Sequence, residues 1–427
     1  MSQALTADDP RYNELFDVAK EAAASNDGGE VYGDLTPQMN ALRDACAAHK
    51  GSLRQLLNAP DLHQAYDTPR EHYTIFSFEA CNRAFRDNQL FSSLGYLESP
   101  GVRSMGKVIL SMVGDEHRRY RAAAQPMFIR PKAMTWWKQN WIDEIVETLL
   151  GRLEGRDAAD LNLELCARLP MHVVTRGIGM DGEAALTFRD HLLRATISRS
   201  VSMEDKMASM AQVSRMLQQL IDERRATPAD DVVSGLIAAD FELAEGGTRK
   251  LTDEEIFGYC RLTILAGGGT TWRQLGITLH ALLTHGFWDA CAKERNLIEA
   301  AVEEAARWRP TDPTFARLVT EDVEIDGVTI PQGARVDICL GAANRDPARW
   351  DDPDRYDIFR PAQTHLGFAI GPHQCLGMNV ARQEMISAIG GLMDRFPNLR
   401  FDPDAAPPEL VGGVEQRGMS HLKVRLR

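Results

Sequence analysis

The chain has 427 residues, of which 44% are hydrophobic and 26% are charged, a composition typical of a soluble globular protein. Its formal net charge of −13 would repel a phosphate backbone, so nucleic acid is not an expected partner. No apolar run reaches the roughly 20 residues that a membrane span requires, and we expect no membrane association.

The start of the chain, the stretch 1–26, and its cysteines bear on the cellular location of the protein and on its redox chemistry. That stretch is polar and acidic and lacks the features of a secretory signal, which predicts a cytoplasmic protein. The seven cysteines are odd in number and show no Cys-x-x-Cys spacing, which argues against a disulfide framework or a zinc site. Because no repeat or linker interrupts the chain, we expect one domain over 1–427 and, by default, a monomer.

The periodicity of apolar residues predicts a mainly α fold with a smaller β portion. Apolar residues recur every three or four positions from about 138 to 285, which favours a succession of helices. The longest predicted helix begins at Thr252, where Glu255 can complete a capping box, and runs to His285-Gly286. Short strands separated by turns are predicted over 323–336.

Three adjacent glycines, Gly267, Gly268 and Gly269, lie in the middle of that long helix. Each costs about 1 kcal/mol relative to alanine in a helix, so something must require backbone access or a distortion at this place. The alternative is that two helices meet here at a glycine C-cap. The sequence leaves both interpretations open.

The segment 368–377 carries the most specific pattern in the chain. It resembles the cysteine-ligand loop of the cytochrome P450 monooxygenases, and the five matching positions are Phe368, Gly371, His373, Cys375 and Gly377. The resemblance implies that family's fold, with a long central helix crossing a heme b (iron protoporphyrin IX). It also implies that Cys375 is the axial ligand of the iron.

The residues around Cys375 give a physical reason for that role. A cysteine just before a helix lies where the helix dipole favours a thiolate, and neighbouring glycines let backbone N–H groups approach the sulfur. A thiolate ligand donates electron density to heme iron and favours O–O cleavage. For an arbitrary cysteine the better guess would be a buried, inert side chain.

Further parts of the resemblance place the rest of the heme site. It implies that the heme propionates bind four side chains, which are His117, Arg121, Arg317 and His373. It implies that Glu304, Arg307 and Arg360 lock the cysteine loop in place. Taken singly, each of these residues could equally form an ordinary surface salt bridge.

The glycine-rich helix resembles the family's oxygen-binding stretch. Ala266 and Gly267 would make room for dioxygen, the co-substrate, and the Thr270 hydroxyl would help to deliver protons. The family usually has an acid just before this threonine, whereas this chain has Gly269. Because a hydroxyl is a weak acid, the protons must come through water, another side chain or the substrate.

The expected activity is insertion of one oxygen atom from O2 into a small hydrophobic substrate by hydroxylation, epoxidation or dealkylation. The chain shows no flavin or iron–sulfur motif, so we expect no fused reductase and a separate ferredoxin or flavodoxin-type donor with its own reductase. A peroxide-driven peroxygenase and a non-catalytic heme sensor remain open. The candidate substrate contacts are Leu97, Leu262, Leu265, Pro313, Phe315 and Gln416.

Overall fold

The computed structural model of the chain describes residues 33–59, 66–180, 182–196 and 201–427. The stretch 1–26, on which the prediction of no secretory signal depends, lies outside the described residues. Within the described ranges, no helix is both long and apolar enough to cross a membrane.

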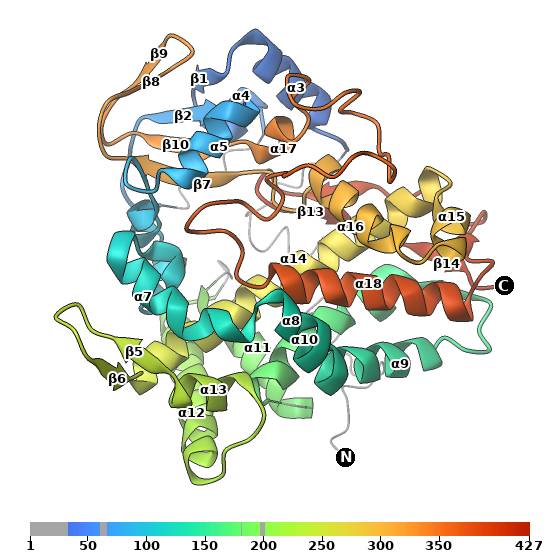
Figure 1. Cartoon of the computed structure of the whole chain (residues 1–427), viewed down its shortest axis with the longest axis horizontal. Coiled ribbons are helices and arrows are strands. Elements are labelled where there is room, and N and C mark those ends of the chain that lie inside the picture. The colour runs from blue at the N-terminus through green and yellow to red at the C-terminus, as the bar shows by residue number, and fades with distance from the viewer. Residues whose placement is uncertain (1–32, 60–65, 181, 197–200) are drawn as a thin grey trace.

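Helices make up most of the described chain, as the sequence predicts, and Figure 1 shows them filling the lower part of the molecule. The α-helices are α3 (Thr36–Ala45), α4 (Leu53–Leu56), α5 (Phe78–Arg86), α6 (Pro100–Ser104), α7 (Gly114–Ala124), α8 (Arg130–Lys132), α9 (Asp143–Gly151), α10 (Arg168–Ile178), α11 (Gly182–Thr196), α12 (Met203–Ala226), α13 (Val232–Ala238), α14 (Asp253–Thr284), α15 (Trp288–Lys293), α16 (Leu297–Trp308), α17 (Leu340–Ala343) and α18 (Met378–Arg395). Short 3-10 helices are η1 (Ser93–Glu98), η2 (Ile109–Ser111) and η3 (Gln125–Met127), and π-helical segments are η4 (Ala133–Ile142) and η5 (Asn162–Cys166).

The β portion is a five-stranded sheet, at the upper left of Figure 1, with several small ladders. The sheet has the order β1 (Ala48–Lys50), β2 (His72–Ile75), β10 (Arg335–Ile338), β7 (Phe315–Val319) and β3 (Phe91–Ser92). Strands β2 and β10 are parallel, which brings an N-terminal segment beside the second half of the chain. The ladders are formed by β4 (Ala158–Asp160), β5 (Asp240–Glu242), β6 (Thr248–Lys250), β8 (Val323–Ile325), β9 (Val328–Ile330), β11 (Arg400–Phe401), β12 (Leu410–Gly412), β13 (Arg417–Met419) and β14 (Lys423–Arg425).

The predicted turns within 323–336 are confirmed. Gly327 connects β8 to β9 with a φ of +75°, and Gly333 precedes β10 with a φ of +84°. Both angles lie in the left-handed region, which glycine adopts at little cost because it has no side chain. The antiparallel hairpin β8–β9 follows directly from this turn chemistry.

Helix α14 is one continuous helix through all three glycines. The predicted capping box is present at its start, where Thr252 Oγ1 accepts from Glu255 N at 3.3 Å and Glu255 Oε2 accepts from Thr252 N at 2.8 Å. It ends before Gly286, whose φ is +72°. At about 1.5 Å per residue, its 32 residues span roughly 48 Å, so it crosses the molecule.

The core surrounds α14, which contacts α10, α16, α18 and β13. Trp272 on α14 is fully buried and its indole N–H donates to Asn162 Oδ1 at 2.9 Å. Trp137 is also fully buried, and a Cβ at Gly177 would lie 2.3 Å from its ring. Burying side chains of this size contributes about 1.5–3 kcal/mol each, which holds α14 rigidly in the middle of the fold.

Candidate active site

The cysteine loop, residues 366–377, is fixed by its own backbone. Cys375 N donates to Phe368 O at 2.9 Å, and Gln374 N donates to Gly371 O at 3.1 Å. Gly371 has a φ of +74°, and a Cβ there would lie 2.5 Å from Phe85 O, so this position requires glycine twice over. Gly377 is the N-cap of α18, which places Cys375 just before a helix, as predicted.

Cys375 is the one exposed cysteine among those in the described part of the chain. Its side chain is accessible to solvent although protein encloses it on the remaining sides, and this burial raises the pKa of the thiol. The backbone N–H of Gly377 and the Arg121 guanidinium act in the opposite direction and lower that pKa. The sulfur therefore has thiolate-stabilising partners and an open approach, which suits a metal ligand.

Three segments bring four side chains together: α7 supplies His117 and Arg121, β7 supplies Arg317, and the cysteine loop itself supplies His373. The rings of His117 and His373 stack with their centroids 4.0 Å apart. Burial, together with the charge of Arg121, lowers the pKa of His117 to about 4. Burial, together with the charges of His117 and Arg317, lowers the pKa of His373 to about 2. Both imidazoles are consequently neutral at pH 7.

These four side chains fit the carboxylates of a heme. The Nε2 atoms of His117 and His373 are buried and have no hydrogen-bond partner in the part of the chain that the structure describes. In the same described part, no acidic side chain forms an ion pair with Arg121 or Arg317. Arg317 Nη1 donates only to Tyr96 Oη at 3.2 Å and to Ala316 O at 2.8 Å. An anionic group here would satisfy the unpartnered nitrogens and offset the clustered positive charge.

The glycines of α14 each admit a neighbouring side chain. A Cβ at Gly267 would lie 2.7 Å from Val174 Cγ2, and one at Gly268 would lie 3.0 Å from Arg189 Nη1. A Cβ at Gly269 would lie 2.9 Å from Arg273 Nη1, which donates to Gly269 O at 3.1 Å. The glycines thus allow close helix packing, and a guanidinium covers the position where the family usually has an acid.

Ala266 and Thr270 lie one turn apart on α14 and face accessible space. Ala266 is exposed and Thr270 is half-buried, although most residues of α14 are buried. The Thr270 hydroxyl donates to Ala266 O at 2.7 Å. This bond is weak in helices and exchangeable, so the hydroxyl remains available to a ligand or water.

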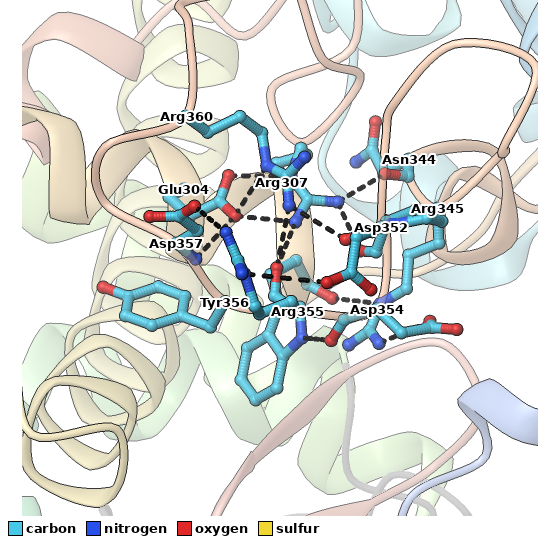
Figure 2. Close-up of polar contacts among 12 residues, drawn as sticks. Glu304, Arg307, Asn344, Arg345, Asp352, Asp354, Arg355, Tyr356, Asp357 and Arg360 are labelled. Carbon is cyan, nitrogen blue, oxygen red and sulfur yellow. Dashed lines mark hydrogen bonds and ion pairs between the residues drawn. The ribbon is translucent and has the colours of Figure 1, made fainter.

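Glu304, Arg307 and Arg360 form the densest polar network near the cysteine loop (Figure 2). Arg307 Nε and Nη2 each donate to the Glu304 carboxylate at 2.7 Å, and Arg360 Nε donates to Glu304 Oε1 at 3.1 Å. Arg307 also donates to the backbone carbonyl oxygens of Asn344 and Pro353, both at 2.9 Å. The network therefore ties α16 to the 344–360 segment that leads into the cysteine loop.

The candidate substrate residues differ in how far their side chains are exposed. Leu97 on η1 is 44% exposed, whereas Leu262 and Leu265 are half-buried against the helical core. Pro313 is buried, and the Phe315 ring lies 6.3 Å from that of Phe85. Gln416 differs from these apolar residues, because its side-chain amide donates from Nε2 to Asp312 Oδ1 at 3.2 Å.

Asp312 and Arg273 are polar residues of this region that the sequence does not reveal. Burial raises the pKa of Asp312 to about 6, and the Arg273 charge opposes that rise. Asp312 directly precedes Pro313 and follows Arg307 by five positions, which is the signal that could have drawn attention to it. The sequence alone does not distinguish Arg273 from any other charged residue of a helix, because its contact with Gly269 O is visible only in the structure.

A surface hollow of about 540 Å³ lies elsewhere, between the end of α14 and residues 397–401. Leu283, Trp288 and Phe401 are among its lining residues. None of the candidate site residues lines this hollow, so it is not part of the candidate active site.

Comparison with known proteins identifies the family. The cytochrome P450 family profile matches residues 288–413. Cytochrome P450 105C1 of a Streptomyces species is 32% identical over 372 residues, which are 86% of this chain and 92% of the relative. Nocardicin C N-oxygenase of Nocardia uniformis subsp. tsuyamanensis is 34% identical over 308 residues, 71% of this chain and 74% of its own.

A solved structure supports the same assignment. The cytochrome P450 PksS of the bacillaene polyketide synthase from Bacillus subtilis 168 superimposes with a TM-score of 0.79 at 25% identity, covering 92% of this chain and 97% of PksS. The chain belongs to the cytochrome P450 family. It is a monooxygenase of the bacterial type, and the predicted family and fold are confirmed.

Proposed function

We propose that residues 1–427 form a single heme domain in which Cys375 is the axial thiolate ligand of heme b. The observation that carries the proposal is the environment of Cys375. Its side chain is accessible on one side, protein surrounds it on the others, and it lies next to the N-terminus of α18. His117, Arg121, Arg317 and His373 would hold the propionates, because their nitrogen atoms lie beside the cysteine loop without carboxylate partners in the described ranges. When bound, the heme supplies activation of dioxygen.

The reaction that we propose inserts one oxygen atom of O2 into a small, largely apolar substrate and reduces the other to water. Two electrons and two protons are needed for each turnover, so that R–H, O2, two electrons and two protons give R–OH and H2O. The chain itself carries no second redox motif, and the electrons would come from a separate ferredoxin or flavodoxin-type donor with its reductase. Leu262 and Leu265 on α14 and Pro313 and Phe315 before β7 would form apolar walls for the substrate.

The α14 residues would handle dioxygen and protons. Ala266 is small and exposed, and Gly267 next to it adds no side chain, so the helix leaves room at this point. The Thr270 hydroxyl would exchange its bond to Ala266 O for a bond to water and so hold a proton near the reacting oxygen. Gly269 provides no acid, and its neighbour Arg273 is a cation, so the protons would come through water, another side chain or the substrate.

Arg118, Arg119 and Arg382 are candidate contacts for an acidic donor protein, but each already has an acidic partner. Arg118 and Arg119 both pair with Asp115, and Arg382 pairs with Glu303 at 2.6 Å. A donor would therefore have to compete with these pairs. The Arg118–Asp115 pair is exposed and individually weak, whereas the side chains of Arg119 and Arg382 are mostly covered.

The test of the proposed function compares two sources of oxygen with the heme-loaded chain. Compounds that shift the Soret band are selected first and then incubated with a ferredoxin, its reductase, NADPH and 18O2. We expect products containing one 18O atom and formed only when the donor is present. Product formed from hydrogen peroxide alone would indicate a peroxygenase, and ligand binding without product would indicate a sensor.

A further inference from the structure

An acidic side chain, Asp312, lies on the loop between α16 and β7 with only one hydrogen-bond partner. Gln416 Nε2 donates to Oδ1 at 3.2 Å, and no other group in the described part of the chain donates to this carboxylate. The side chain is only partly accessible. A carboxylate in such surroundings usually accepts several hydrogen bonds, because losing water is costly for a charge.

Packing places Asp312 near α14, because its partner Gln416 directly precedes β13, which packs against α14. The positive charge of Arg273 on α14 lowers the pKa of Asp312, and the charge of Asp312 raises the pKa of the Cys375 thiol. Both effects fall with distance and with solvent screening, so they agree with a position near α14 and the cysteine loop.

The β12–β13 hairpin holds this arrangement from one side. Gln416, just before β13, binds Asp312, and Gly418 in β13 admits the stem of Arg273, since a Cβ there would lie 2.8 Å from Arg273 Cγ. The guanidinium of Arg273 is directed back along α14, where Nη1 donates to Gly269 O, and the whole side chain is buried. The group left open to a ligand is consequently the carboxylate and not the guanidinium.

The energetic cost of this arrangement favours a functional role. Burial raises the pKa of Asp312 to about 6, so the group is still ionised at pH 7 and above. An asparagine or leucine of similar volume would avoid that cost without losing any backbone contact that Asp312 makes. Carboxylates that are buried, weakly bonded and close to a reacting centre commonly bind or transfer a charged group.

We propose that Asp312, oriented by Gln416, is a specificity-determining residue that binds the cationic group of an otherwise apolar substrate. This inference rests on the proposed function, because it concerns the substrate of the same site. It narrows the substrate class to apolar molecules with an ammonium or similar cation. Carboxylic acids of the same size would be disfavoured by repulsion from Asp312.

Binding of three probes of similar shape to the heme-loaded full chain tests the proposal. The probes are a phenylbutyl trimethylammonium ion, its uncharged tert-butyl isostere and phenylpentanoate. The trimethylammonium nitrogen has no lone pair, so it cannot coordinate iron and imitate specific binding. At pH 7.5 we expect the dissociation constant, measured by equilibrium dialysis, to be about tenfold lower for the cation than for its isostere and highest for the anion.

Asp312→Asn should reduce the cation preference to about one while leaving the affinity for the isostere unchanged. Asp337→Asn is the matched control, because Asp337 on β10 is also half-buried with a pKa raised to about 6, but its carboxylate accepts from Leu53 N of α4 at 2.9 Å. This control should keep the tenfold preference. If Asp312→Asn does not fold, Asp312→Ser takes its place.

Equal affinity of the wild-type protein for the cation and the isostere would overturn the inference, as would a preference that survives removal of the carboxylate. Neither result would touch the proposed function, which depends on heme binding and turnover. Conversely, a protein that binds no heme would fail the proposed function before any probe is added.

Discussion

The two sides of the proposed heme site differ in how completely their polar groups are partnered. On the cysteine side, Glu304 and Arg307 have side chains that are 6% and 3% exposed, and their charged atoms bond to one another, to Arg360 and to backbone carbonyls. On the α14 side, the side chains of Thr270 and Asp312 are partly accessible, and each has a single hydrogen-bond partner. The cysteine side is therefore a rigid support, whereas the α14 side retains polar groups that can bind ligands.

Removing the charge of Glu304 should have the largest effect. Glu304→Gln leaves the buried guanidinium of Arg307 and the neighbouring Arg360 without their shared anion, which we expect to cost about 3–5 kcal/mol. Urea unfolding of the purified chain measures this loss. The matched control is Glu299→Gln on the same helix, whose exposed ion pair with Arg130 should contribute less than about 1 kcal/mol. Equal destabilisation by both variants would contradict the distinction between the two sides.

Thr270→Ala should alter the fate of oxygen more than the stability of the fold. We expect the fraction of electrons recovered in product to fall severalfold and hydrogen peroxide to accumulate, because a proton-holding hydroxyl is lost. NADPH consumption, product and peroxide are measured together. Thr278→Ala is the control, since its hydroxyl donates to Gln274 O at 2.7 Å in the same helical geometry but is fully buried. Unchanged coupling in Thr270→Ala, or equal uncoupling in both variants, would remove Thr270 from this role.

Gly269→Asp should have the smallest effect. A Cβ at this position meets the flexible end of Arg273 at 2.9 Å, so the guanidinium can move aside and then pair with the new carboxylate. We therefore expect coupling to change less than twofold, since the added acid is held by Arg273 and not by Thr270. A large gain in coupling would show that the new carboxylate delivers protons in spite of Arg273.

The sequence predicts the parts of the molecule that depend on local chemistry. The start of α14 follows from the capping box of Thr252 and Glu255, and the turn at Gly333 follows from its need for a positive φ. The cysteine loop is equally local, because its pattern lies within ten consecutive residues. The long helix predicted from Thr252 is confirmed, but the sequence alone does not exclude a break at its glycines, because the side chains that pack against them, Val174 and Arg189, come from other helices.

The polar wall opposite the cysteine loop is the part that the sequence does not predict. Arg273, Asp312 and Gln416 come from a helix, a loop and a hairpin, and they meet only through the tertiary fold. No spacing rule connects them, and each has an ordinary explanation when it is considered alone. The sequence indicates Gln416 as a candidate substrate contact but gives no such indication for its partner Asp312.

The ligand role of Cys375 is tested most directly by Cys375→Ser. We expect the reduced wild-type protein to show the carbon monoxide band that is characteristic of a thiolate-ligated heme. We expect the variant to lose this band, while Cys291→Ser, which changes a buried cysteine, should retain it. An unaltered band in Cys375→Ser would contradict the assignment of this sulfur as the iron ligand.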